Sequence, residues 1–195
     1  MNYFAMDPPF EIKEFREMRK REAQQYFDWF ISQIPHRLNQ LETLYTWSTE
    51  SGAHPLDFSR ESLAALWEWF IPLVESESKS PEQIKKELAN LPEWRHKVYL
   101  EQSPEFTLAT HSFITDICIY FGEVFRKEFP ALQWGLVTRP KLLYCVNRPV
   151  IVSGGSNFEL DPRHLVYIQT LKVQSNKSNN QALLELFDIR TKSLK

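Results

Sequence analysis

The chain has 195 residues, of which 43% are hydrophobic and 14% aromatic, with only five glycines. This composition supports a sizeable packed core and argues against a disordered chain or a glycine-rich β fold. The formal net charge of −2 provides no overall positive field for a nucleic-acid backbone, so a nucleic-acid partner is not expected. The charge is uneven, because residues 141–195 carry eight Lys/Arg against four Asp/Glu while the remainder is acidic.

Apolar runs in the sequence are short, and none approaches the roughly 20 residues of a membrane-spanning helix. The first residues show no basic segment followed by an apolar stretch, which is the pattern of a secretory signal. We therefore expect a cytoplasmic protein without a membrane partner. Cys118 and Cys145 are accordingly expected to be buried free thiols.

Two helices are predicted before residue 50. Asp7–Pro9 combines a capping residue with prolines suited to a first turn, and apolar residues then recur at helical spacing up to Ile34. Pro35 predicts an end or a kink there, because a proline inside a helix removes one backbone hydrogen bond. A second helix is expected to follow, to about Trp47.

Two further helices are indicated before the middle of the chain. Apolar residues at helical spacing predict a helix with a buried stripe over Leu63–Ile71. Ser80–Gln83 has the form of a capping box with proline at the first helical position, and it predicts a helix to about Asn90.

The stretch 107–134 is apolar around most of its helical circumference and contains Pro130 near its end. It predicts a long central helix, from about residue 104 to 129, around which the other helices pack. Gly122 lies in its interior, where glycine costs up to about 1 kcal/mol relative to alanine. Its presence therefore predicts a close approach of another segment.

After Pro130 the pattern changes to short β-rich runs, at Leu132–Val137, Leu142–Val146 and Val150–Ser153. They predict a small antiparallel sheet over about residues 132–153. Leu160–Pro162 and the apolar residues of 182–189 predict C-terminal helices. The expected fold is therefore α+β and predominantly α, in a single domain of residues 1–195.

A polar stripe on the central helix carries the first candidate site. Asp116, Tyr120, Glu123 and Lys127 recur at spacings of four, three and four. Asp116 and Glu123 are candidate catalytic residues, because two carboxylates can form an acid–base pair or bind a cation. The competing interpretation is structural, with a Glu123–Lys127 ion pair and Asp116 paired to a neighbouring residue. A metal site would require further ligands, and no Glu-x-x-His pair supplies them.

Two more residues are candidates for binding, together with Tyr120 and Lys127. Trp69 falls on the face opposite the buried stripe of its helix, where it is either covered by another layer or an exposed aromatic anchor for a partner. Arg19 shares a helical face with apolar residues. It either extends its charged end to water or contacts an anion or a partner carboxylate.

Catalytic and cofactor motifs are missing from the sequence. The five histidines make no zinc-binding spacing with a cysteine, and there is no H-E-x-x-H, G-x-S-x-G, phosphate loop or G-x-G-x-x-G. We therefore expect no cofactor and no metal, and an enzymatic role is the less favoured interpretation.

The run Asp116–Phe125 followed by Trp134, with Asn147–Val152 and Leu160–Pro162 after it, resembles a pattern in small uncharacterised bacterial α+β families. Some of these are predicted immunity or accessory proteins. The resemblance covers about residues 107–165, consists of structural elements, and implies no catalytic residues.

The sequence favours a non-enzymatic, cytoplasmic protein-binding module of immunity type or regulatory type. Abundant aromatic residues and the acidic first part of the chain support this, since aromatic anchors with charged rims are usual in protein interfaces. Glutamates around Glu75–Glu82 fit a basic partner. The alternative is a small-substrate or metal-dependent enzyme that uses Asp116 and Glu123, and a homo-oligomeric protein is a third hypothesis.

Overall fold

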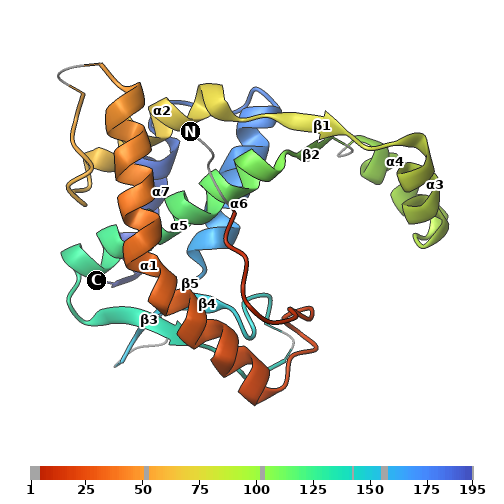
Figure 1. Cartoon of the computed structure of the whole chain (residues 1–195), viewed down its shortest axis with the longest axis horizontal. Coiled ribbons are helices and arrows are strands. Elements are labelled where there is room, and N and C mark those ends of the chain that lie inside the picture. Colours follow the sequence, from red (N-terminus) through yellow and green to blue (C-terminus); the bar gives the residue numbers. More distant parts are fainter. Residues whose placement is uncertain (1–4, 51–52, 102–103, 142, 155–157, 195) are drawn as a thin grey trace.

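The structure is a computed structural model that describes residues 5–50, 53–101, 104–141, 143–154 and 158–194. The fold is α+β and mostly α, as predicted, with two small antiparallel sheets (Figure 1). The helices are α1 (Lys20–Ser48), α2 (Ser62–Phe70), α3 (Pro81–Ala89), α4 (Glu93–Glu101), α5 (Leu108–Glu128), α6 (Pro162–Gln174) and α7 (Ala182–Thr191), with 3-10 turns η1 (Ile71–Leu73) and η2 (Lys192–Leu194). The strands are β1 (Ser76–Ser78), β2 (Pro104–Phe106), β3 (Leu132–Leu136), β4 (Pro149–Ser153) and β5 (Glu159–Leu160).

Helix α5 is the predicted central helix, and most of its residues are buried between Thr110 and Phe125. Helices α1 and α6 pack along it. It begins four residues later than expected, because Pro104–Phe106 pairs with Ser76–Ser78 as a strand. Thr107 then caps the helix by accepting a hydrogen bond from the backbone N–H of Thr110 at 3.2 Å.

The N-terminal helices differ from the prediction. Residues 7–19 are not part of a regular helix, and α1 runs without interruption from Lys20 through Pro35 to Ser48. Pro35 removes one hydrogen bond, but its ring faces solvent. Ile34, Leu41 and Tyr45 are buried on either side of it. The packing of this face holds the helix together across the proline, which overrides the local preference for a break.

The three-stranded sheet has the order β3-β4-β5 and is antiparallel, with Trp134 opposite Ile151 and Ile151 opposite Leu160. The predicted strand Leu142–Val146 is wrong over residues 143–146, which form turns, while Leu142 lies outside the described residues. Asn147 explains the turn, because it has a φ of 61° and its amide donates to the carbonyl of Phe15 at 2.7 Å. The third strand is formed instead by Glu159–Leu160, which sequence reasoning missed.

The core confirms two expectations about particular residues. Cys118 and Cys145 are both buried and free. Gly122 lies where helix and sheet meet, and a Cβ atom placed on it would be 2.5 Å from the Trp134 ring. No real side chain tolerates that distance without movement, so the glycine allows the close contact between α5 and the sheet.

In the part of the chain that the structure describes, every helix is too short or too polar to cross a membrane.

Candidate functional site

The residues of the predicted polar stripe of α5 lie in different environments. Asp116 is buried and bonded to another helix. Arg37 of α1 donates from Nε and Nη2 to the two carboxylate oxygens at 2.6 and 2.7 Å. Both side chains are at most 3% exposed. Burial raises the pKa of the Asp116 carboxyl and lowers that of Arg37. The two hydrogen bonds oppose both shifts, because they favour the charged forms. Asp116 therefore holds α1 against α5.

Tyr120 is also inside the protein, at 1% exposure. Its hydroxyl accepts the backbone N–H of Phe58 at 2.8 Å and lies 2.6 Å from the Ser62 hydroxyl. Its ring stacks on Phe58 at 4.8 Å. Burial raises the pKa of this phenol to about 12. Tyr120 thus anchors the segment before α2 and is not available on the surface.

Glu123 and Lys127 lie nearer the surface, with partners other than each other. Glu123 accepts from Arg126 at 2.7 Å and from the indole N–H of Trp134 at 2.7 Å. Lys127 donates to the backbone carbonyl of Asp57 at 2.5 Å. The structure therefore does not bring Glu123 together with Asp116. Among the described residues, no group of three His, Cys, Asp or Glu side chains is placed to hold a metal ion.

The other two candidates have structural contacts as well. Trp69 is partly buried, with edge contacts to Tyr45 and Phe113, and its indole N–H donates to Ser48 at 2.8 Å. This matches the alternative in which another layer covers Trp69. Arg19 precedes α1 as its N-cap residue, and its backbone N–H donates to the Glu22 carboxylate at 2.7 Å while the side chain is exposed.

A different part of the chain stands apart from the body. Residues 75–107, which we call the arm, contain β1, α3, α4 and β2. Figure 1 shows the β1–β2 ribbon leaving the body and carrying α3 and α4 at its far end. Both helices pack mainly against each other. Sequence reasoning found the α3 capping box but did not foresee that this segment projects.

The base of the arm is firmly attached to the body. The backbone N–H of Glu75 donates to the Thr110 hydroxyl at 2.9 Å, and that hydroxyl donates back to the Glu75 carbonyl at 3.0 Å. The N–H of Thr107 also donates to the Glu75 carbonyl, at 3.1 Å. Phe106 is 5% exposed and packs into the core. These contacts give the arm a defined starting direction.

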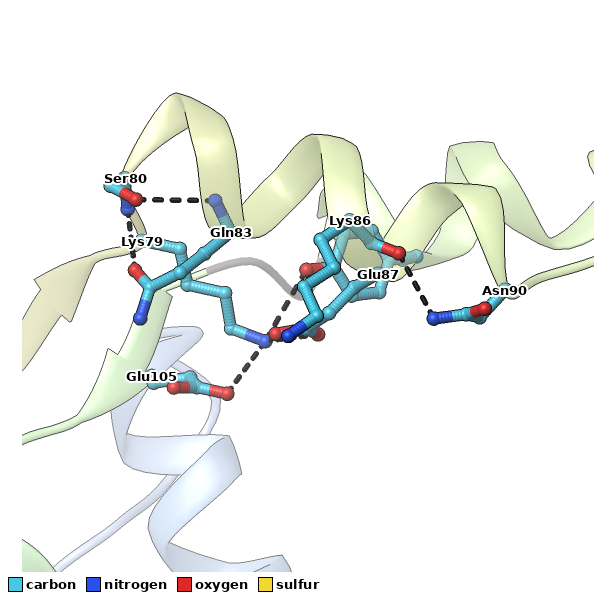
Figure 2. Close-up of polar contacts among 8 residues, drawn as sticks. Lys79, Ser80, Gln83, Lys86, Glu87, Asn90 and Glu105 are labelled. Atoms are coloured by element: carbon cyan, nitrogen blue, oxygen red, sulfur yellow. Dashed lines mark hydrogen bonds and ion pairs between the residues drawn. The ribbon is translucent and has the colours of Figure 1, made fainter.

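Lys79 joins the ribbon to both helices of the arm, as Figure 2 shows in part. Its ammonium group lies 2.6 Å from Glu105 of β2 and 2.7 Å from Glu87 of α3. It also donates to the hydroxyl of Tyr99 in α4 at 3.3 Å. Hydrogen bonds to Glu105 and Glu87 raise the pKa of Lys79. One side chain therefore joins three elements of the arm.

Local caps complete the α3 helix. Ser80 accepts the backbone N–H of Gln83 at 3.2 Å, and the Gln83 side chain accepts the N–H of Ser80 at 2.9 Å, which confirms the predicted capping box (Figure 2). At the other end, the Asn90 amide donates to the Lys86 carbonyl at 3.1 Å. These bonds matter because a nine-residue helix is marginal without tertiary packing.

The tip of the arm presents apolar groups to solvent. None of the side chains described in α3 and α4 is buried. Trp94 is 78% exposed and Leu100 is 49% exposed. A large aromatic group on a projecting, capped helix pair is typical of an anchor in a protein interface. The sequence signal for this site is the α3 capping box followed by Trp94.

We expect Lys79→Met to loosen the arm while the body stays folded, because the substitution removes the charged bonds that join β2, α3 and α4. The loss should be about 1 kcal/mol, or roughly five-fold faster amide exchange confined to residues 76–106. Hydrogen exchange with mass-spectrometric readout measures this directly. Lys85→Met, which replaces an exposed lysine of α3, is the control and should leave exchange unchanged. Equal exchange in the two variants would contradict the role of Lys79.

Comparisons with known proteins identify no relatives from which a role is inherited. No protein-family model, no curated protein and no solved structure matches this chain.

Proposed function

We propose that this chain is a non-enzymatic protein-binding module and that the arm is its docking element. The observation that carries the proposal is the exposure of Trp94 on a helix pair that is anchored at its base and whose helices make their main contacts with each other. Protein interfaces concentrate their binding energy in a few aromatic anchors surrounded by polar residues. The arm has this arrangement.

The chemistry around Trp94 indicates the kind of partner surface. Trp94 is flanked by Glu93 and Arg95, and the Arg95 guanidinium lies 5.7 Å from the indole ring. An apolar pocket rimmed by charges of both signs would receive this group, with the indole buried and the flanking charges at the edge. An accessory role of immunity type or regulatory type is consistent with a module that acts by occupying such a pocket. A cytoplasmic location is part of this proposal.

Replacement of Trp94 tests the proposal. We expect the wild-type chain to recover one protein in stoichiometric amount from its native cells, and Trp94→Ala to lose most of it, because truncating an aromatic anchor costs 2 kcal/mol or more, about 30-fold in affinity. Trp47→Ala is the matched control, since Trp47 is 76% exposed at the end of α1, away from the arm. Equal recovery with Trp94→Ala and wild type, or recovery of no protein, would contradict the proposal.

A second copy of this chain is the alternative partner of the arm, and a separate measurement identifies it. If the arm binds another copy, the solution mass of the wild-type chain doubles with concentration, and Trp94→Ala remains a monomer. Sedimentation of both variants over a range of concentrations separates this case from a different partner protein.

A further inference from the structure

A second surface feature lies at the root of the arm, on the opposite end from Trp94. It is an open groove of about 350 Å³ between α5, α6 and two loop segments. We call it the basic groove, and its principal lining residues are Phe15, His111, Arg148, Arg163, His164 and Tyr167. A volume near 350 Å³ is at the lower end of the range for small-molecule sites.

The groove has a basic lining, although the buried Asp161 carboxylate lies 3.8 Å from one of its arginines. Two arginines and two histidines face it, and its described lining residues include no carboxylate. Arg148 and Arg163 belong to the part of the chain that the sequence shows to be basic. Burial, followed by the nearby charge of Arg163, lowers the pKa of His111. The charge of Glu105 acts on His111 in the opposite sense and raises its pKa.

Arg148 contacts an aromatic ring and forms a long ion pair with the buried Asp161 carboxylate. Its guanidinium lies over the Phe15 ring at 5.2 Å, and its Nη1 is 3.8 Å from the Asp161 carboxylate, beyond hydrogen-bond distance. Within the described chain, Arg148 Nε and Asp161 Oδ2 are buried and have no hydrogen-bond partner. Buried polar atoms of this kind are uncommon in native proteins. Both residues line a small inner cavity of about 20 Å³, enough for one water molecule.

Helix α6 places its first turn at the groove. Asp161 caps the helix by accepting the N–H of His164 at 2.9 Å, which uses its other oxygen. Arg163 and His164 follow directly, so two basic side chains lie at the positive end of a 13-residue helix. The helix dipole adds to the field of the two arginines.

Aromatic rings form the other wall. The rings of His111 and Tyr167 are nearly parallel, with centroids 6.4 Å apart and an angle of 9° between their planes. Phe106, at the base of the arm, meets both rings edge-on and supports them from the protein side. Tyr167 is 36% exposed, so part of its ring is available to a planar or apolar group.

We propose that the basic groove binds a small phosphorylated molecule, with its phosphate held by Arg148 and Arg163 and its organic part against Tyr167. A phosphate monoester carries about two negative charges and accepts several charge-assisted hydrogen bonds, which suits two guanidinium groups better than a single carboxylate does. The Asp161 carboxylate lies 3.8 Å from Nη1 of Arg148 and lines the inner cavity with it. This site does not depend on the function of the arm.

Phenyl phosphate is a suitable probe, used with the full chain at constant ionic strength. We expect millimolar phenyl phosphate to raise the melting temperature of the wild-type chain and to bind with measurable heat in titration calorimetry. Arg148→Gln and Arg163→Gln should each weaken binding at least about ten-fold. Arg95→Gln, an exposed arginine on the arm, should bind as wild type does. Trp94→Ala should also bind normally, which separates this site from the docking proposal.

Benzoate and inorganic phosphate separate the contribution of the phosphate group to binding from that of the ring. Benzoate should bind at least about ten-fold more weakly than phenyl phosphate, because it carries one charge instead of two. Inorganic phosphate should bind, but more weakly than phenyl phosphate, because it lacks the ring. No binding of phenyl phosphate to wild type, or equal binding to Arg163→Gln, would overturn the site. Equal binding of benzoate would overturn the assignment to phosphate.

Discussion

Asp116→Ala is expected to lower the free energy of unfolding by about 3–5 kcal/mol, because it removes the buried carboxylate that balances the charge of the buried Arg37 guanidinium. Arg37 is 3% exposed and gives two hydrogen bonds to this carboxylate. The total stability of a domain is typically about 5–15 kcal/mol. The single substitution should therefore remove a large share of it, which denaturant unfolding measures.

The double variant Arg37→Met with Asp116→Leu measures the net contribution of the ion pair to stability. Apolar side chains of similar volume avoid the desolvation of both charges, so the double variant should be much more stable than either single variant and can approach wild type. Gln40, which accepts a hydrogen bond from Arg37 at 2.9 Å, is partly exposed and can bind water instead.

This cycle also tests whether Asp116 has a chemical role. If the pair is structural, the double variant retains partner binding through the arm and ligand binding in the basic groove. A single Asp116→Ala variant as stable as wild type would contradict the structural role. Glu123→Gln is the control for the stability measurement, since Glu123 is the other carboxylate of the stripe but lies near the surface, bonded to Arg126 and Trp134.

The sequence predicted those features that depend on neighbouring residues. The α3 cap at Ser80, the apolar surface of α5 and the close contact at Gly122 all follow from short-range patterns. The alternation that marks a strand was sufficient for β3 and β4, but the apolar run before Asn147 forms turns. Its amide bonds to the carbonyls of Phe15 and Met18, which are more than 100 residues away. No local pattern contains that information.

The candidate site could not be predicted from the sequence, because it depends on which distant segments lie close together. Asp116 was recognisable as a polar residue on an apolar helix, but its partner Arg37 is 79 positions away. Arg148 and Arg163 were visible only as part of a basic excess in residues 141–195, and the groove forms when α5 and Phe15 join them. The arm projects because α3 and α4 make their main contacts with each other. A periodic pattern in the sequence does not show this.

Gly122→Ala is expected to destabilise the protein by about 1–3 kcal/mol, although alanine is the better helix former by about 1 kcal/mol. The added Cβ would lie 2.5 and 2.8 Å from two atoms of the Trp134 ring and 3.3 Å from Ile151. The ring has little freedom to move, because its N–H bonds to Glu123 at 2.7 Å and it makes a T-shaped contact with the Phe30 ring, with the centroids 5.2 Å apart. Overpacking should therefore exceed the gain in helix propensity.

Gly154→Ala provides the control, because no described atom beyond its chain neighbours lies within 4 Å of a Cβ atom at that position. It should change the free energy of unfolding by less than about 0.5 kcal/mol. A cycle with Trp134→Phe identifies the contact, since phenylalanine lacks the ring atoms that meet the new methyl group. We expect the cost of Gly122→Ala to fall by about 1 kcal/mol or more in the Trp134→Phe background. An unchanged cost would mean that the ring of Trp134 is not what requires glycine at position 122.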